Sequence, residues 1–110
     1  MTKFTVRTNA RCEMIDITDK VATFVRESGL RDGICHVFVP HTTAALTINE
    51  NADPDVPRDI LDSLDRVVPL SNRYRHAEGN AAAHVKASLL GASQTVFVEN
   101  GRLVLGTWQS

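Results

Sequence analysis

The sequence predicts an α+β fold with about five strands and three helices, and three observations support this prediction. Two apolar runs near the C-terminus flank Glu99-Asn100-Gly101-Arg102, and an Asn-Gly pair at this position favours a tight β-hairpin. Three segments repeat apolar residues at helical spacing. The strands are not separated regularly by helices, which argues against a doubly wound parallel sheet.

The N-terminal part of the chain predicts a strand followed by a helix. Residues 3–8 alternate apolar and polar side chains, which is the pattern of a strand with one buried face. Asp16 or Thr18 can accept the free backbone N–H groups at the start of a helix, and apolar residues then recur at helical spacing. Gly29 suits the left-handed residue that commonly follows a helix.

The middle of the chain predicts two more strands and a second helix. Residues 34–39 are apolar on both faces except at His36, which is typical of a central strand. Residues 42–48 are small and β-branched, which also favours a strand. Asp53 and the proline after it resemble a helix cap with proline at the first helical position, and an apolar stripe then runs to Pro69.

The C-terminal part predicts a third helix and the hairpin. Asn80 can cap a helix over residues 81–90, and Gly91 would end it. Residues 95–98 and 103–105 form the apolar arms of the hairpin. The Asn-Gly pair between them tolerates positive φ at both central positions of a type I′ turn.

Length and charge narrow the class of protein. The chain has 110 residues, a usual size for a single domain. Its 12 Lys and Arg residues balance 13 Asp and Glu residues, so it lacks the excess positive charge that favours nucleic acid. No stretch approaches the ~20 apolar residues of a membrane span, and no secretory signal follows Met1. We therefore expect a cytoplasmic protein in which Cys12 and Cys35 are reduced.

The first candidate functional segment runs from His41 to Asn51. His41 follows Pro40 at the end of an apolar strand, where a polar side chain can emerge into a cleft. Its imidazole can act as a ligand or as an acid and base near neutral pH, or it can have a structural role. Asn49 and Asn51 can instead shape the turn into the next helix through hydrogen bonds to the backbone.

The second candidate segment carries two imidazoles, a carboxylate (Glu78) and a carboxamide. Asn80 and His84 share one face of the predicted helix, and His76 lies in the loop before it. Free N–H groups at the start of that helix favour an anion such as phosphate, and Arg75 adds a cation beside them. The segment is compatible with a phosphate pocket and with a metal site, although its spacing is not a standard zinc motif.

Other segments add no recognised catalytic motif. The sequence contains no nucleophile elbow, phosphate-binding P-loop or dinucleotide-binding glycine motif. Asp59, Asp62 and Asp65 fall along one amphipathic helix, and we interpret them as its solvated face. His36 alternates with apolar residues and is expected to lie within the packed sheet.

Four segments are distinctive when taken together. In chain order they are HTTAALTINEN (41–51), DILDSLDRVVP (59–69), YRHAEGNAAAHVKASLLG (74–91) and SQTVFVENGRLVLGTWQS (93–110). Together they resemble the YjbQ-like family, a widespread group of small proteins commonly described as secondary thiamine-phosphate synthases. The resemblance covers residues 34–110 closely and residues 1–33 more loosely.

The resemblance implies a compact α+β fold on a β-sandwich-like core of antiparallel or mixed strands. It also implies a homotrimer with a pocket near a subunit boundary. The family's histidine pattern falls on His41, His76 and His84, around a small anion or a metal ion. Family chains usually continue past the Thr107-Trp108-Gln109 motif by a further strand. The single YjbQ-like domain over residues 1–110 is therefore expected to lack the family's C-terminal strand.

The implied activity joins a pyrimidine pyrophosphate to a thiazole phosphate and yields thiamine phosphate and pyrophosphate. Two alternatives stay open: a trimer that binds a metal or phosphorylated metabolite without turnover, and a metal-dependent phosphate-ester hydrolase. A divalent cation would be held by the three histidines; imidazole favours Zn²⁺, whereas pyrophosphate chemistry usually uses Mg²⁺. The expected partner is a small phosphorylated metabolite, and not nucleic acid or membrane. Catalytic roles are assigned to His41, His76, Glu78 and His84, and substrate contacts to Thr42, Thr43, Asn49, Arg75 and Asn80.

Overall fold

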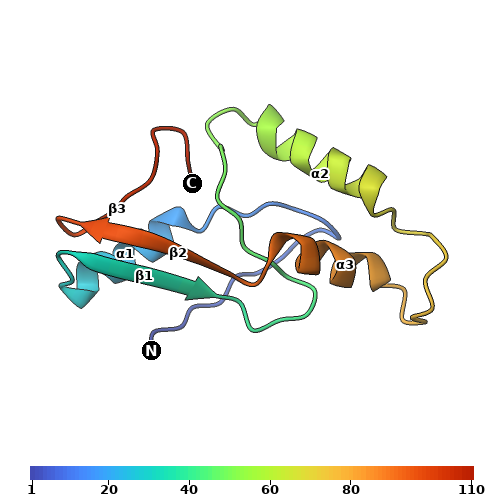
Figure 1. Ribbon diagram of the computed structural model, residues 1–110, viewed down its shortest axis with the longest axis horizontal. Helices are drawn as coiled ribbons and strands as arrows, with labels where there is room; N and C mark the ends of the chain where they lie inside the picture. Colours follow the sequence, from blue (N-terminus) through green and yellow to red (C-terminus); the bar gives the residue numbers. More distant parts are fainter.

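The computed structural model describes residues 1–110 and confirms an α+β fold with three helices and an antiparallel sheet (Figure 1). All three predicted helices form close to their expected ends. The elements are, in chain order, α1 (Thr18–Ser28), β1 (Gly33–Phe38), α2 (Asp55–Val67), α3 (Ala81–Leu90), β2 (Ser93–Glu99) and β3 (Arg102–Leu103).

The three strands form one antiparallel sheet in the order β1-β2-β3. β1 pairs along its whole length with β2, and Phe38 lies opposite Ser93 at one end of the ladder. The turn between β2 and β3 contains Asn100 and Gly101, whose φ angles are 51° and 75°. A type I′ turn requires positive φ at both central positions, so the predicted hairpin is confirmed.

α1 lies behind the sheet in Figure 1 and packs against β3. Val21 and Val25 of α1 are buried, as are Val96 and Val98 of β2. These four valines form the centre of the core between the helix and the inner face of the sheet. Gly29 ends α1 with a left-handed φ of 73°, as the sequence predicts.

Two of the predicted strands are wrong. Residues 3–8 and 42–48 belong to no strand. The alternation in residues 3–8 reflects side-chain packing instead, because Phe4 stacks on Phe24 of α1 with 5.4 Å between ring centroids. The β-branched composition of residues 42–48 suits a pleated surface but does not supply a partner strand. The chain therefore contributes one sheet of three strands, and no second sheet of a sandwich forms within it.

β1 is an edge strand and not the central strand that the sequence predicts. Its side chains alternate between a half-buried and an exposed face, because only one face is covered by other elements. His36 therefore lies exposed and is not within a packed sheet. Its Nδ1 is 2.8 Å from the hydroxyl oxygen of Thr95 on β2.

Two polar contacts hold the connection between α2 and α3. Lys86 of α3 forms an ion pair with Asp65 of α2. Asp65 therefore does not belong to a purely solvated face, which corrects the interpretation from the sequence. The Tyr74 hydroxyl donates to the Pro69 carbonyl oxygen at 2.5 Å, which closes the first part of the loop between the helices. α2 ends before Pro69, as predicted.

The molecule is elongated and exposes much apolar surface. Its radius of gyration is 15.6 Å, against about 13 Å for a compact domain of this length. Its accessible surface is 8290 Å², about 2,300 Å² more than a compact monomer of this mass exposes. Part of the excess is the exposed face of the sheet, which we call the outer face. Its apolar side chains are Ile34, Phe38, Phe97 and Val104, each at least half exposed.

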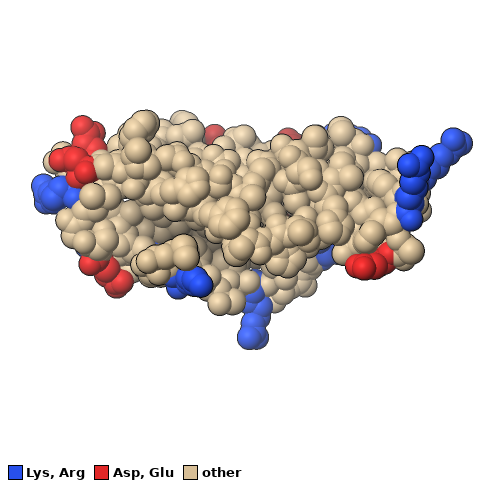
Figure 2. Space-filling model, turned by 60° about the horizontal axis from the view of Figure 1, so that its bottom comes forward, with Lys and Arg blue, Asp and Glu red and all other residues tan.

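The charged side chains do not gather into a basic stripe on the face drawn in Figure 2. That view turns the side of the N-terminus and β1 forward, and Lys, Arg, Asp and Glu lie mainly around its margin. None of the helices combines the length and apolar composition needed to cross a bilayer.

Candidate functional site

Two of the predicted site residues, His76 and His84, come into contact. Their ring centroids are 5.2 Å apart and their planes meet at 74°, an edge-to-face arrangement. His84 lies in the first turn of α3, and His76 lies in the loop that enters this helix. We call these two residues the histidine pair.

Glu78 stands beside the histidine pair. Its Oε1 lies 3.9 Å from Nε2 of His76. The His76 side chain is 43% exposed, so the pair is open to a ligand from solvent. A contact this long and this exposed contributes little to stability, because water screens it.

The start of α3 adds hydrogen-bond donors to the site. Gly79 has a φ of 82°, a left-handed conformation that turns the loop into the helix. The predicted side-chain cap by Asn80 does not form. Its backbone carbonyl accepts from the N–H groups of Ala83 and His84, while its buried Oδ1 has no partner. The N–H groups of Ala81 and Ala82 lack a side-chain cap, and both residues are buried. The start of a helix favours an anion in general.

Arg75 lies next to His76 in the loop and is exposed. Its guanidinium carries five donors that match the oxygens of a phosphate group. The structure thus gathers Arg75, His76, Glu78, Asn80 and His84 into one short segment around the start of α3.

His41 is engaged in a separate local arrangement. Its Nδ1 accepts a hydrogen bond from the backbone N–H of Thr43 at 3.1 Å, and the Thr43 hydroxyl oxygen lies at the same distance. His41 thus has the structural role that was one of the two interpretations from the sequence. The contact uses Nδ1 and leaves Nε2 free. Thr42 is exposed beside it.

The structure contains no group of three or more His, Cys, Asp or Glu side chains that could hold a metal ion. The three histidines that the family resemblance implies as ligands therefore do not form a metal-binding group as they lie here. As they lie in this chain, these residues do not fit a divalent cation.

Asn49 lies at another place, on the wall of a cavity of about 180 Å³. This cavity is bounded by the start of α1, the inner face of the sheet and residues 45–51. The Asn49 backbone pairs with that of Ser110, and its Oδ1 accepts from the next backbone N–H at 2.7 Å. The side chain thus shapes its own turn, which was the second interpretation offered by the sequence.

The same cavity contains a fixed carboxylate. Asp16 accepts hydrogen bonds from the hydroxyl and the backbone N–H of Thr18, at 2.6 and 2.9 Å. These two bonds hold the pKa of Asp16 below its ordinary value. The sequence did not predict this cavity, because about half of its lining is apolar and the lining residues come from segments distant in the sequence.

Comparison with known proteins identifies the family to which this chain belongs. The sequence profile of the family described as "UPF0047 protein YjbQ-like" matches residues 2–110. UPF0047 protein YugU of Bacillus subtilis is 56% identical over 105 residues, which cover 94% of this chain and 80% of that protein. A UPF0047 protein of Methanocaldococcus jannaschii is 48% identical over 107 residues, covering 97% and 78% of the two chains.

Solved structures of other proteins show the same similarity in fold. The crystal structure of a hypothetical protein from Aeropyrum pernix matches with a TM-score of 0.91 and 38% identity, over 96% of this chain and 80% of the other. A YbjQ-like protein from Sulfolobus solfataricus matches with a TM-score of 0.90 and 40% identity, over 94% and 76% of the two chains.

Proposed function

Given that the chain belongs to the UPF0047 YjbQ-like family, we propose that it binds a phosphorylated small molecule at the start of α3. The histidine pair would then exchange a proton with the phosphate group. The observation that carries this proposal is the edge-to-face contact of His76 and His84 at 5.2 Å, beside a helix start without a side-chain cap.

Charge and hydrogen bonding in this segment suit a phosphate. Free N–H groups at a helix start attract anions, and Arg75 can contribute two parallel hydrogen bonds to phosphate oxygens. An imidazole titrates near neutral pH, so one member of the pair can donate a proton while the other stays neutral. Glu78 lies 3.9 Å from His76, on the same side of the helix start.

The reaction proposed for this site is the transfer of a pyrimidinylmethyl group from pyrophosphate to the nitrogen of a thiazole phosphate. The bond between the methylene carbon and the pyrophosphate oxygen breaks, and a bond from the thiazole nitrogen to that carbon forms. Charge accumulates on the departing pyrophosphate, and donors placed around it stabilise the transition state. A proton from His76 or His84 would assist the same departure.

The test is an assay of thiamine phosphate formation from these two substrates with purified protein. His76→Ala and His84→Ala should each lower the rate about 100-fold, the size of a typical acid–base contribution. His36→Ala is the matched control, because His36 is also exposed but lies on the sheet, and it should keep full activity. Rates within a few-fold of the parent in both site variants would remove the pair from the mechanism.

Binding and hydrolysis are separated by two further measurements. Calorimetric titration with inorganic pyrophosphate reports binding that does not depend on turnover. Tight pyrophosphate binding without thiamine phosphate formation would support the non-catalytic alternative. Release of phosphate from a generic ester would support the hydrolase. The transferase is the activity that the family resemblance implies, so it is the reaction to test first.

The family resemblance also implies a homotrimer, and we propose this assembly for the chain. The excess of about 2,300 Å² over a compact monomer exceeds what a standard protein–protein interface buries in total. The apolar outer face is a surface of the kind that subunits cover. Sedimentation equilibrium at micromolar concentration should give three times the mass of the chain, and a stable monomer would contradict the proposal.

A further inference from the structure

The cavity between the start of α1, the inner face of the sheet and residues 45–51 is separate from the histidine pair, because neither His76 nor His84 lines it. Its volume is about 180 Å³, and an apolar cavity of about 150 Å³ is enough to hold benzene. On its wall Val21 and Val96 are buried, whereas Asp16 at its rim is exposed. The cavity therefore has an apolar interior and a polar rim that a small molecule can reach from solvent.

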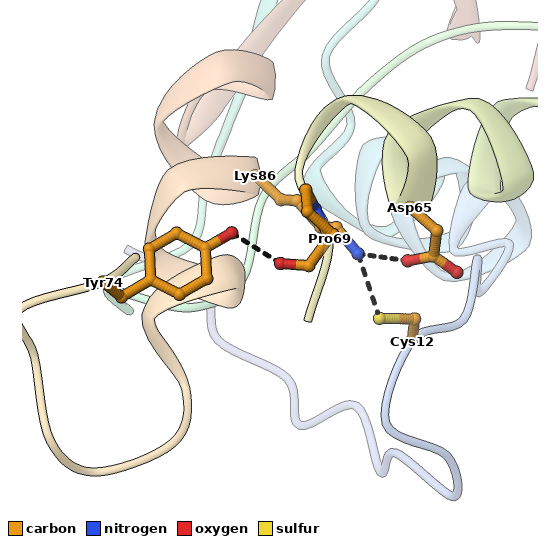
Figure 3. A network of polar contacts seen from close by, with 5 residues as sticks. All are labelled: Cys12, Asp65, Pro69, Tyr74 and Lys86. Atoms are coloured by element: carbon orange, nitrogen blue, oxygen red, sulfur yellow. Dashed lines mark hydrogen bonds and ion pairs between the residues drawn. The ribbon is translucent and has the colours of Figure 1, made fainter. Parts of the chain in front are cut away.

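The charged side chains that line this cavity are all acidic. They are Glu13, Asp16 and Glu50, and the lining includes no Lys, Arg or His side chain. None of the three carboxylates takes part in an ion pair. Figure 3 shows the contrasting case of Asp65, whose carboxylate faces the ammonium group of Lys86. We propose that the cavity binds an organic cation, a protonated primary amine on an apolar body about the size of a benzene ring.

Asp16 is placed to receive the ammonium group of this ligand. Its Oδ1 accepts hydrogen bonds from the N–H and hydroxyl of Thr18, and its Oδ2 accepts one from Nδ2 of Asn51 at 3.0 Å. A carboxylate has about four acceptor positions, so Oδ2 can accept a further donor. The bonds from Thr18, with a smaller effect from Asn51, hold the pKa of Asp16 below its ordinary value. The side chain is therefore a carboxylate at neutral pH.

The interior of the cavity supplies the contact for the apolar body. Its wall is built from one helix, all three strands and the loop before α2, through Val21, Val37, Leu46, Val96 and Leu103. A ring packed against these side chains leaves water, while its ammonium group stays at the rim and keeps part of its hydration. The ligand thus avoids the cost of burying a charge. An anion of the same size would instead face three carboxylates.

Three probes of nearly equal size test the preference for a cation: benzylammonium, benzyl alcohol and benzoate. Each is titrated into the isotope-labelled full chain at pH 7, and NMR of the backbone amides reports affinity and position. We expect benzylammonium to bind at least ~10-fold more tightly than benzyl alcohol, with shifts centred on residues 13–18 and 45–51. Benzoate should show no saturable binding, and salt should weaken only the cation. Equal affinities for benzylammonium and benzyl alcohol, or shifts centred elsewhere, would overturn the proposal.

A variant of Asp16 tests the carboxylate at the rim. Asp16→Asn should lower the affinity for benzylammonium about 5-fold and leave that for benzyl alcohol unchanged, whereas a purely structural role would change both. Asp62→Asn is the matched control, because it removes an equal charge from an exposed position on α2 outside the cavity. An equal loss in the control would show that general surface charge attracts the amine. Glu50→Gln gives the same comparison if Asp16→Asn fails to fold.

A variant of Ala45 tests the apolar interior. Ala45 lines the cavity, and Ala45→Leu places a larger side chain in the same space. The affinities for benzylammonium and benzyl alcohol should both fall at least ~5-fold, because the ring loses its apolar contacts. Unchanged affinities would place the amine on the surface and not in the cavity, which would contradict the proposal. The positions of the NMR shifts locate the ligand independently if this variant fails to fold.

Discussion

His76 and His84 lie edge to face with 5.2 Å between their ring centroids, although one belongs to a loop and the other to a helix. The left-handed Gly79 makes this contact possible, because it turns the chain back toward the first turn of α3. Glu78 then falls beside His76, within 3.9 Å. A short segment of chain therefore builds the whole candidate site, and the predictions below concern this segment and the elements that support it.

Replacement of Tyr74 by phenylalanine should loosen the loop that carries the site. The change removes the hydrogen bond from the Tyr74 hydroxyl to the Pro69 carbonyl but keeps the aromatic ring. We expect a loss of about 1 kcal/mol in the free energy of unfolding. Pyrophosphate binding should weaken as well, because Arg75 and His76 follow directly in the chain. Calorimetry with pyrophosphate and urea unfolding measure the two effects, and unchanged values in both would contradict this role.

Replacement of Asp16 by asparagine should reduce stability in a pH-dependent manner. The folded-state pKa of Asp16 lies below its ordinary value of 3.8, because Thr18 hydrogen-bonds the carboxylate. The carboxylate therefore stabilises the fold above pH 3.8, and this contribution is lost as the pH falls through the lowered pKa. At pH 7 the variant should be less stable by about 1 kcal/mol, and the difference should disappear in acid.

Urea unfolding from pH 7 down to acid tests this dependence on Asp16. Asp62→Asn is the control, because Asp62 is an exposed carboxylate on α2 and should leave stability almost unchanged. A stability difference for Asp16→Asn that stays constant over the whole range would show that the carboxylate charge is not involved.

Replacement of Gly101 by alanine should destabilise the hairpin. Gly101 has a φ of 75°, and a side chain at this angle is strained even though the nearest atom to a Cβ would be 3.8 Å away. We expect a loss of about 1 kcal/mol, measured as a lower melting temperature. Asn100→Gly is the matched control, because glycine accepts the φ of 51° there without strain. A melting temperature for Gly101→Ala as high as that of the control would contradict the strain argument.

Replacement of Phe97 by aspartate should disrupt the proposed trimer. Phe97 lies opposite Ile34 on the outer face and is 66% exposed in the single chain. A charge at the centre of this face would have to be desolvated in an interface. The variant should therefore sediment as a monomer while keeping the circular dichroism of the folded chain. Thr95→Asp is the control, because it places a charge on the same strand beside His36, and the His36 imidazole can pair with that charge. This variant should therefore disrupt the trimer less than Phe97→Asp.

The helices could be predicted from the sequence because their signals are local. Each signal lies within a few residues of the helix or turn that it predicts. These signals are the apolar spacing, Asp53 before α2, Gly29 after α1 and the Asn-Gly turn. The contact within the histidine pair was predictable for the same reason, since His76 lies only a few residues before the helix that carries His84.

The remaining features depend on partners distant in the sequence. Residues 3–8 and 42–48 have strand-like composition, but a strand exists only when another strand pairs with it. The Lys86–Asp65 ion pair joins two helices across a loop, so no spacing rule indicates it. The position of His41 likewise depends on how a loop folds back, and local hydrogen bonding to Thr43 decides it.

Only seven of the 110 residues are buried, and this affects how a single chain would denature. A chain that hides little apolar area releases little on unfolding, so its heat-capacity increment and its denaturant slope should both be small. If copies associate, the area hidden between them adds to both quantities. Melting would then depend on protein concentration, and dilution alone would weaken the fold.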